Sequence, residues 1–243
     1  MRTASIGCLA VFCLLAIQQQ TWAQAVEEEP RSIAGETSVK PGINEGFLNP
    51  ELDVDEMVER FEMESREIFV ARERILAACG IEKGHEVADI GAGTGLFSRM
   101  FAVEVGNDGW VFAVDIAPRL IKHITEESTR QELNNVTGVV CAENSVNLPP
   151  GSVDVVFICD TYHHFEYPQA TMASIRRALR PGGHLILIDF ERIPGESREW
   201  ILGHVRAGKE EVRGEIEDAD FEYVAESDID GLEENYFIKF RKN

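Results

Sequence analysis

The chain has 243 residues, of which 44% are hydrophobic, and it carries 43 acidic against 23 basic side chains for a formal charge of −20. Its length suits one domain with a substantial core, and its hydrophobic fraction excludes a disordered chain. The negative charge argues against nucleic acid or an anionic membrane face as a partner, because both bind basic surfaces.

The first residues have the pattern of a secretory signal peptide. Arg2 precedes an apolar stretch over residues 4–17, and the small-x-small run Ala23-Gln24-Ala25 follows it. As a helix this stretch covers about 21 Å, less than the roughly 30 Å of a bilayer core, so a retained membrane anchor is the weaker alternative. We expect residues 1–25 to be removed on export to the bacterial periplasm, leaving no stable membrane anchor.

Residues 26–50 are rich in Glu, Gly and Pro and lack apolar periodicity, which predicts a flexible linker. Residues 51–243 are the expected domain, and its first part is helical. Apolar side chains recur there at helical spacing from Val54 through Phe61 and Ile75 toward Cys79-Gly80.

Beyond residue 80, short apolar runs alternate with helical patterns. The expected strands cover residues 85–90, 110–115, 137–141, 153–159 and 184–190. The expected helices cover residues 96–105, 118–127 and 168–180, and Pro181-Gly182-Gly183 ends the last of them. This alternation predicts an α/β fold with a doubly wound, mostly parallel sheet covered on both faces.

The last section has a different pattern. A helical pattern at Val212 and Ile216 precedes an apolar run over residues 221–225, and apolar residues then alternate with others over 236–240. Two such runs close together predict an antiparallel strand pair at the edge of the sheet.

A glycine-rich turn, Gly91-Ala92-Gly93-Thr94-Gly95, lies where the first strand ends and a helix begins. Glycines permit a tight turn and close approach to a ligand, and the helix amino end offers unpaired N–H groups. The spacing is G-x-G-x-G, so Leu96 stands where a dinucleotide fingerprint needs its third glycine. Asp89 adds a carboxylate that would repel a pyrophosphate and attract a ligand with sulfonium and ammonium groups.

Asp115 ends the second strand, twenty residues beyond Gly95. A carboxylate at this place can accept hydrogen bonds from both hydroxyls of a ribose. The combination of strand, glycine turn, helix and acid predicts nucleoside binding. The structural alternatives are that Asp89 caps a helix and that Asp115 simply begins a loop.

Residues 85–190 resemble the class I S-adenosylmethionine-dependent methyltransferases, specifically the type-11, ubiquinone/menaquinone-methyltransferase-like group. Five motifs carry the resemblance: VADIGAGTG at 87–95, AVDI at 113–116, LPPGSVDVV at 148–156, DTYHHF at 160–165 and LRPGG at 179–183. The resemblance implies S-adenosylmethionine as cofactor and a seven-stranded sheet of order 3-2-1-4-5-7-6 with a C-terminal antiparallel pair.

The resemblance also implies the cofactor contacts. Gly91, Ala92, Gly93 and Gly95 would pass beneath the methionine part of the cofactor, with Asp89 nearby. These residues all belong to one short segment that runs from the end of the first strand to the start of the following helix.

The nucleoside part would lie along the next two strands. By the resemblance, Asp115 binds the ribose and Ile116 lies against the adenine, whereas Ala142 and Glu143 occupy the adenine edge. The chain departs from the pattern at Cys141, where many relatives place an Asp for the adenine amino group.

The candidate catalytic residues follow the fourth strand. By the resemblance Asp160 faces the methyl-bearing end, and His163 and His164 come next, at the edge where open α/β sheets bind ligands. Imidazole has a pKa near neutrality, which suits it as a base for in-line methyl transfer. The alternative is that one His packs against the sheet and the other bonds the backbone. The adjacent pair lacks companion ligands at a metal-site spacing, so no metal is expected.

Further candidates lie near the C-terminus. Arg192 and Arg206 are candidates for holding an anionic acceptor, and Trp200 and His204 are candidates for a lid or acceptor wall.

The cysteines of the expected domain are predicted to be free thiols. The strand order implied by the resemblance separates Cys141 and Cys159 by three strand steps, or roughly 14 Å, whereas a disulfide needs Cα atoms within about 7 Å.

The expected function is therefore S-adenosylmethionine-dependent methyl transfer to a small-molecule acceptor. Two alternatives stay open. An NAD-type oxidoreductase would share the glycine turn and Asp115, but the turn lacks the third glycine and Asp89 disfavours a pyrophosphate. A non-catalytic nucleoside-binding protein of the same fold is the other.

Overall fold

The computed structural model describes residues 35–64 and 66–243. The expected signal peptide at residues 1–25 and the first part of the expected linker lie outside these residues. Within the described ranges, none of the helices has the length and apolar character needed to cross a membrane.

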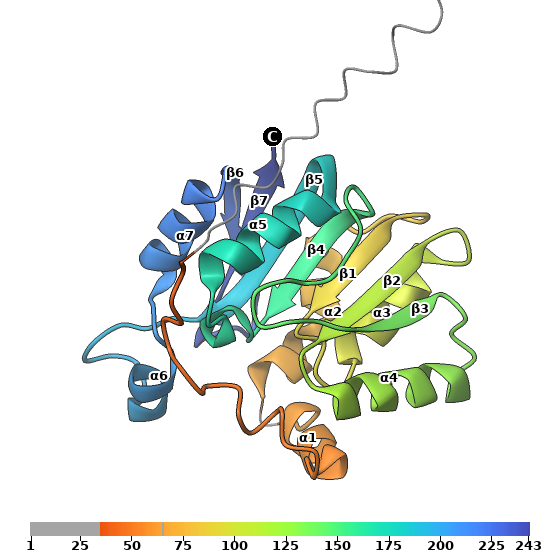
Figure 1. The fold of residues 1–243 in the computed structure, drawn as a ribbon, viewed down its shortest axis with the longest axis horizontal. Coiled ribbons are helices and arrows are strands. Elements are labelled where there is room, and N and C mark those ends of the chain that lie inside the picture. The colour runs from red at the N-terminus through yellow and green to blue at the C-terminus, as the bar shows by residue number, and fades with distance from the viewer. Residues whose placement is uncertain (1–34, 65) are drawn as a thin grey trace, which may run out of the picture. The chain divides into compact units, whose positions relative to one another are not determined.

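Seven strands form one sheet in the order β3-β2-β1-β4-β5-β7-β6 (Figure 1). Strands β1 to β5 pair in parallel, and β7 runs antiparallel between β5 and β6. The strand order and the antiparallel closing pair expected from the sequence are confirmed. The strands are Glu86–Ile90 (β1), Trp110–Asp115 (β2), Val136–Val140 (β3), Val153–Cys159 (β4), Leu179–Phe190 (β5), Phe221–Ser227 (β6) and Asn235–Lys242 (β7).

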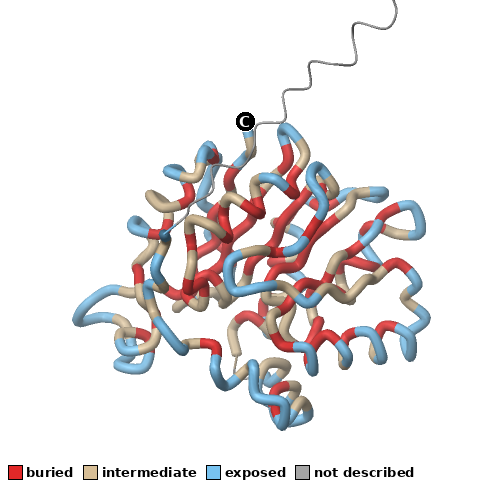
Figure 2. Tube along the Cα trace, viewed as in Figure 1, coloured by how far each residue is buried: buried red, intermediate tan, exposed pale blue. Residues whose placement is uncertain are grey.

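Helices cover both faces of the sheet. Helices α2, α3 and α4 pack on one face, and α5 and α7 pack on the other, so the central strands are buried on both sides (Figures 1 and 2). This double burial explains why those strands read as continuous apolar runs. The helices are Val54–Phe61 (α1), Glu67–Cys79 (α2), Leu96–Val105 (α3), Pro118–Arg130 (α4), Pro168–Ala178 (α5), Glu199–His204 (α6) and Lys209–Asp218 (α7), with a 3-10 turn at Tyr162–His164 (η1).

The N-terminal helical pattern is divided into two helices rather than forming one. Helix α1 begins at Asp53, whose Oδ1 accepts the Glu56 N–H at 3.1 Å, and it packs near α4 through Met57. Helix α2 instead packs on α3. The two helices have different partners, so the chain bends between them and carries Glu62 and Arg66 to the carboxyl edge of the sheet.

Strand β5 begins earlier than the sequence suggested. Helix α5 ends at Ala178, and Leu179 already pairs with Val153 of β4. A Cβ on Gly183 would lie 2.8 Å from the Asp154 carbonyl oxygen, so the glycine lets β5 approach β4 closely. The Pro-Gly-Gly run therefore shapes a strand rather than ending a helix.

Residues 35–50, which we call the N-terminal strap, differ from the expected flexible linker. The Val39 N–H donates to the Glu166 carbonyl at 2.9 Å, and the Ser38 hydroxyl donates to Glu166 Oε2 at 2.6 Å. Asn44 Nδ2 donates to the His164 carbonyl at 3.0 Å. Polar contacts fix the strap to the loop after β4, and such contacts leave no apolar periodicity in the sequence.

Candidate active site

A cavity of about 650 Å³ lies at the carboxyl edge of the parallel strands, where open α/β sheets bind ligands. It brings together nearly all of the residues predicted for the site. The wall contains Asp89, Gly91, Ala92, Gly93, Asp115, Ile116, Ala142, Glu143, Asp160, His163 and His164. Gly95 does not line the cavity.

The glycines of the turn serve the packing of the protein itself. Gly91 has φ +71°, and a Cβ there would lie 2.2 Å from Thr161 Cγ2. Gly95 has φ +79°, and a Cβ there would lie 2.8 Å from Ile124 Cγ1 of α4. At both positions a side chain would strike a neighbouring element, and positive φ already favours glycine. Gly93 alone faces the cavity with no such obstruction.

Asp115 is bound to the glycine turn. Its Oδ2 accepts the Gly93 N–H at 2.9 Å, and its Oδ1 accepts the Ala117 N–H at 2.8 Å. The residue is only 6% exposed, and burial raises the pKa of its carboxyl to about 6 against the opposing effect of these N–H groups. Each oxygen keeps acceptor capacity, so the carboxylate can still accept the hydroxyls of a sugar.

Asp89 is buried at the end of β1 with 3% exposure. The Ser98 hydroxyl of α3 donates to its Oδ2 at 2.6 Å. Burial raises the pKa of its carboxyl to about 7, and nearby Asp115 adds to the rise. A cationic group in the cavity would favour the charged carboxylate and lower this pKa again.

The wall beyond Asp115 is less polar. Ile116 and buried Leu120 line it, and the Cys141 N–H donates to the Asp115 carbonyl at 3.0 Å. Ala142 forms an isolated bridge with Ser145, which turns the chain after β3. Within the described residues all three cysteines are free, as predicted.

Asp160 is held by two side chains that lie far from it in the sequence. It has φ +49°, an uncommon backbone conformation for a residue other than glycine. Arg66 forms an ion pair with it, and Asn235 Nδ2 donates to its Oδ1 at 2.5 Å. Burial raises the pKa of the Asp160 carboxyl to about 6, although Arg66 opposes the rise.

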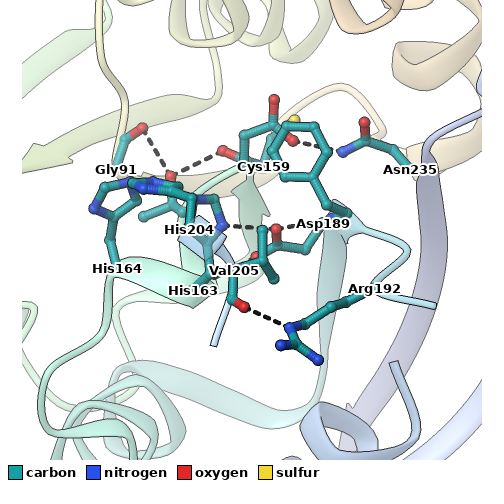
Figure 3. Close-up of polar contacts among 12 residues, drawn as sticks. Gly91, Cys159, His163, His164, Asp189, Arg192, His204, Val205 and Asn235 are labelled. Carbon is teal, nitrogen blue, oxygen red and sulfur yellow. Dashed lines mark hydrogen bonds and ion pairs between the residues drawn. The ribbon is translucent and has the colours of Figure 1, made fainter. Parts of the chain in front are cut away.

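His163 is oriented by Asp189 at the end of β5. The two side chains meet at 2.7 Å between Nδ1 and Oδ1, and the His163 backbone N–H donates to Asp189 Oδ2 at 3.1 Å (Figure 3). The imidazole is 4% exposed. Burial acts to lower its pKa, but the Asp189 carboxylate outweighs that effect and the pKa is raised.

His164 and His204 complete a group of three imidazoles (Figure 3). Their Nε2 atoms lie 3.3 Å apart, and His164 Nδ1 lies 3.2 Å from Asn44 Oδ1 of the N-terminal strap. Burial and the neighbouring His163 lower the pKa of His164 to about 3 and that of His204 to about 4. Both imidazoles are therefore neutral at physiological pH.

The arginines proposed to hold an anion are occupied elsewhere. Arg192 donates to the carbonyls of Val205 at 2.8 Å and Leu202 at 3.1 Å, and Arg206 forms two bonds to Glu215, at 2.7 and 2.6 Å. Neither lines the cavity, whereas Trp200 and His204 do, and their role as a lid or acceptor wall stays a prediction. The sequence missed Asp189, for which the only signal was an acid at the end of a strand.

Comparison with known proteins finds relatives over the central part of the chain. Residues 88–187 match the family model described as "Methyltransferase domain". The ubiquinone/menaquinone biosynthesis C-methyltransferase UbiE of Cupriavidus taiwanensis is 27% identical over 119 residues, which make up 49% of this chain and 48% of that protein. The chain thus spans about half the length of the curated relatives it matches.

Solved structures share the fold. The SAM dependent methyltransferase from Aquifex aeolicus has a TM-score of 0.69 and 23% identity, over 79% of this chain and 99% of that one. Phosphoethanolamine N-methyltransferase 2 of Haemonchus contortus, in complex with S-adenosyl-L-methionine, has a TM-score of 0.57 and 19% identity, over 73% of this chain and 46% of that one.

Proposed function

We propose that the whole protein transfers a methyl group from S-adenosylmethionine to a small aromatic acceptor, and the match of residues 88–187 to the methyltransferase domain model supports this proposal. The observation that carries the proposal is that one cavity has two chemically different ends. Two buried acids, Asp89 and Asp115, flank the glycine turn at one end. Three imidazoles and aromatic side chains form the other end.

The acid end suits the donor. The donor supplies an electrophilic methyl carbon on a sulfonium, which leaves as a neutral thioether when that carbon is attacked. Asp89 offers negative charge for the ammonium and sulfonium groups, and Asp115 accepts the ribose hydroxyls. Ile116 and Leu120 give the adenine an apolar wall.

The imidazole end suits the acceptor. An oxygen or nitrogen nucleophile loses its proton as it attacks, so a base must lie within reach of it. His163 and His164 both line this end. His163 is the better base, because Asp189 holds its ring in one orientation and raises its pKa, whereas burial lowers the pKa of His164 to about 3. The acceptor's lone pair forms the bond to the methyl carbon, the carbon–sulfur bond breaks toward sulfur, and the proton passes to an imidazole. Asp160 lies between the two ends and would position the methyl group.

The aromatic lining supports an aromatic acceptor. Phe190 contacts Trp200 edge to face at 5.4 Å between ring centroids, and Phe47 contacts His164 in the same way at 5.4 Å. These rings border the imidazole end and offer stacking surfaces. The Cupriavidus relative is named as a C-methyltransferase of ubiquinone and menaquinone biosynthesis, which agrees with an aromatic acceptor.

Calorimetry on the full chain tests the donor. We expect S-adenosylmethionine and S-adenosylhomocysteine to bind and NAD to give no heat, because Asp89 would face a pyrophosphate. Tight NAD binding would favour the oxidoreductase alternative instead. Formation of S-adenosylhomocysteine in the presence of a panel of phenols and hydroquinones then tests catalysis. If the protein binds S-adenosylmethionine but forms no S-adenosylhomocysteine with any acceptor, a non-catalytic nucleoside-binding protein is favoured.

We further propose that residues 1–25 direct export to the periplasm, on the support of their signal-peptide pattern alone. Amino-terminal sequencing of the native protein tests this. A mature chain beginning at Val26 is expected, and a chain that retains residues 1–25 in the cytoplasm would contradict it.

A further inference from the structure

The three imidazoles at the acceptor end lie close enough to share one ion. One ring nitrogen from each of His163, His164 and His204 falls within 4.8 Å of the others. The rings come from two places in the chain, η1 and the end of α6, which the fold brings to one wall of the cavity.

In two of the rings an oxygen atom occupies Nδ1. The Nδ1 atoms of His163 and His164 lie against oxygen acceptors, Asp189 Oδ1 at 2.7 Å and Asn44 Oδ1 at 3.2 Å. An Nδ1 with such a partner carries the hydrogen, so Nε2 keeps its lone pair. Metal-binding histidines are oriented by the same kind of outer partner, a carboxylate or another oxygen on the far ring nitrogen.

The distance between the rings fits a metal ion. Two nitrogens bound tetrahedrally to Zn²⁺ at about 2.0–2.1 Å lie about 3.3 Å apart, and the Nε2 atoms of His164 and His204 are 3.3 Å apart. A hydrogen bond between the two rings also fits this distance, but it leaves the Nε2 of His163 without a role.

The surroundings fix the third ring and supply charge. His204 stacks on Trp200 at 4.8 Å between centroids, and Lys40 donates to its carbonyl oxygen. Asp189 and Asp160 provide negative charge beside the cluster, whereas Lys40 and Arg60 oppose a cation. Of these four charges only the buried Asp189 bonds one of the rings directly.

We propose that His163, His164 and His204 bind one divalent transition-metal ion, Zn²⁺ by preference, with its fourth position open to the cavity. Three protein ligands with an open place are the pattern of catalytic zinc sites, and imidazole suits Zn²⁺. The sequence predicted no metal because the adjacent pair His163-His164 lacks companion ligands at a metal-site spacing, and His204, forty residues later, was interpreted as part of a lid or acceptor wall.

Such an ion gives the acceptor a second way to lose its proton, a step that rests on the proposed function. The acceptor hydroxyl binds the open position and releases its proton to solvent. Its oxygen then forms the bond to the methyl carbon as the carbon–sulfur bond breaks toward sulfur. The histidines act here through the ion and not as direct bases.

The test uses the full chain with a purification tag that contains no histidine. After dialysis against Zn²⁺ and then metal-free buffer, elemental analysis is expected to find about one zinc per chain. Titration with Co²⁺ alone is expected to give the visible absorption of a tetrahedral ion. His204→Ala is expected to weaken Zn²⁺ binding at least about 100-fold, and Asp189→Asn about 10–100-fold.

His123→Ala is the matched control, since it removes a histidine of α4 outside the cluster and is expected to leave zinc content unchanged. Circular dichroism and S-adenosylhomocysteine binding check that each variant folds. No retained zinc and no Co²⁺ absorption in the parent protein would overturn the proposal, as would equal zinc content in parent and His204→Ala. Zinc content, Co²⁺ absorption and circular dichroism need neither the methyl donor nor its product, so these three measurements stay informative if the proposed function fails.

Discussion

Asp115 Oδ2 accepts the backbone N–H of Gly93 at 2.9 Å, so the acid at the end of β2 is bonded directly to the turn that leaves β1. The two elements expected to hold different parts of one ligand are a single hydrogen-bonded unit. A ligand that forms hydrogen bonds with the Asp115 carboxylate is therefore linked through it to the backbone of the glycine turn.

Replacing Asp115 should lower the affinity for the methyl donor and its product. In Asp115→Asn one oxygen acceptor becomes an N–H donor, which loses either the Gly93 bond or a ribose bond. We expect S-adenosylhomocysteine affinity to fall at least about tenfold, since a lost hydrogen bond to a charged group costs about 1.5–3 kcal/mol. Calorimetry measures the loss. The exposed Asp108 near the start of β2 gives the control, and equal affinities in Asp108→Asn and Asp115→Asn would contradict the assignment.

Donor affinity should fall as the pH falls below 7. Asp89 has a pKa of about 7 in the free protein, because burial favours its neutral form. A cationic donor favours the carboxylate, so below that pKa binding must displace a proton. Each pH unit below 7 is expected to reduce the affinity by up to about tenfold. Calorimetry between pH 5.5 and 8, in buffers of different ionisation enthalpy, measures both affinity and released protons. A flat profile with no proton release would count against a charged contact at Asp89.

The same carboxyl should make the ligand-free fold less stable at high pH. An acid whose pKa is raised on folding favours the folded state at low pH, and this contribution is lost as the pH rises from 3.8 through about 7. Asp89→Asn removes the titrating group, so the variant is expected to be more stable than the parent at pH 8 by about 1–3 kcal/mol. The full shift would correspond to about 4 kcal/mol. Urea unfolding at pH 5.5 and 8 measures the difference, and a variant less stable at both would oppose the prediction.

Gly91 should tolerate no side chain. In Gly91→Ala the new Cβ would meet Thr161 Cγ2 at 2.2 Å, in addition to the cost of positive φ. In Gly80→Ala the φ of +66° is similar, but the nearest atom, Lys239 Nζ, lies 3.8 Å away. We expect about 1 kcal/mol of destabilisation at Gly80 and at least about 2 kcal/mol more at Gly91. Thermal melts of both variants measure this, and equal losses would show that Thr161 yields.

The fold, and the placement of the glycine turn and Asp115 in one cavity, could largely be predicted from the sequence because their signals are local. The strand runs, the glycine turn and Asp115 each occupy a few consecutive residues, and the sheet order followed from the resemblance. The acceptor end depends on residues far apart in the chain. His164 meets Asn44 and His204, and His163 meets Asp189, and no periodicity connects such partners.

Two features of the structure differ from the sequence-based prediction because they depend on contacts between distant parts of the chain. The N-terminal strap is held by polar contacts with the loop after β4 and with the first turn of α5, so its sequence resembles that of a linker. The division between α1 and α2 follows from their separate packing partners, which helical spacing alone does not reveal.

The N-terminal strap also sets where the protein can be shortened. Both carboxylate oxygens of Glu36 accept N–H groups from the first turn of α5, at Gln169 and Ala170, each at 2.9 Å. Processing after Ala25 would keep this anchor. A recombinant version started at residue 51, the boundary that composition suggests, would leave the amino end of α5 uncapped and remove the partner of His164.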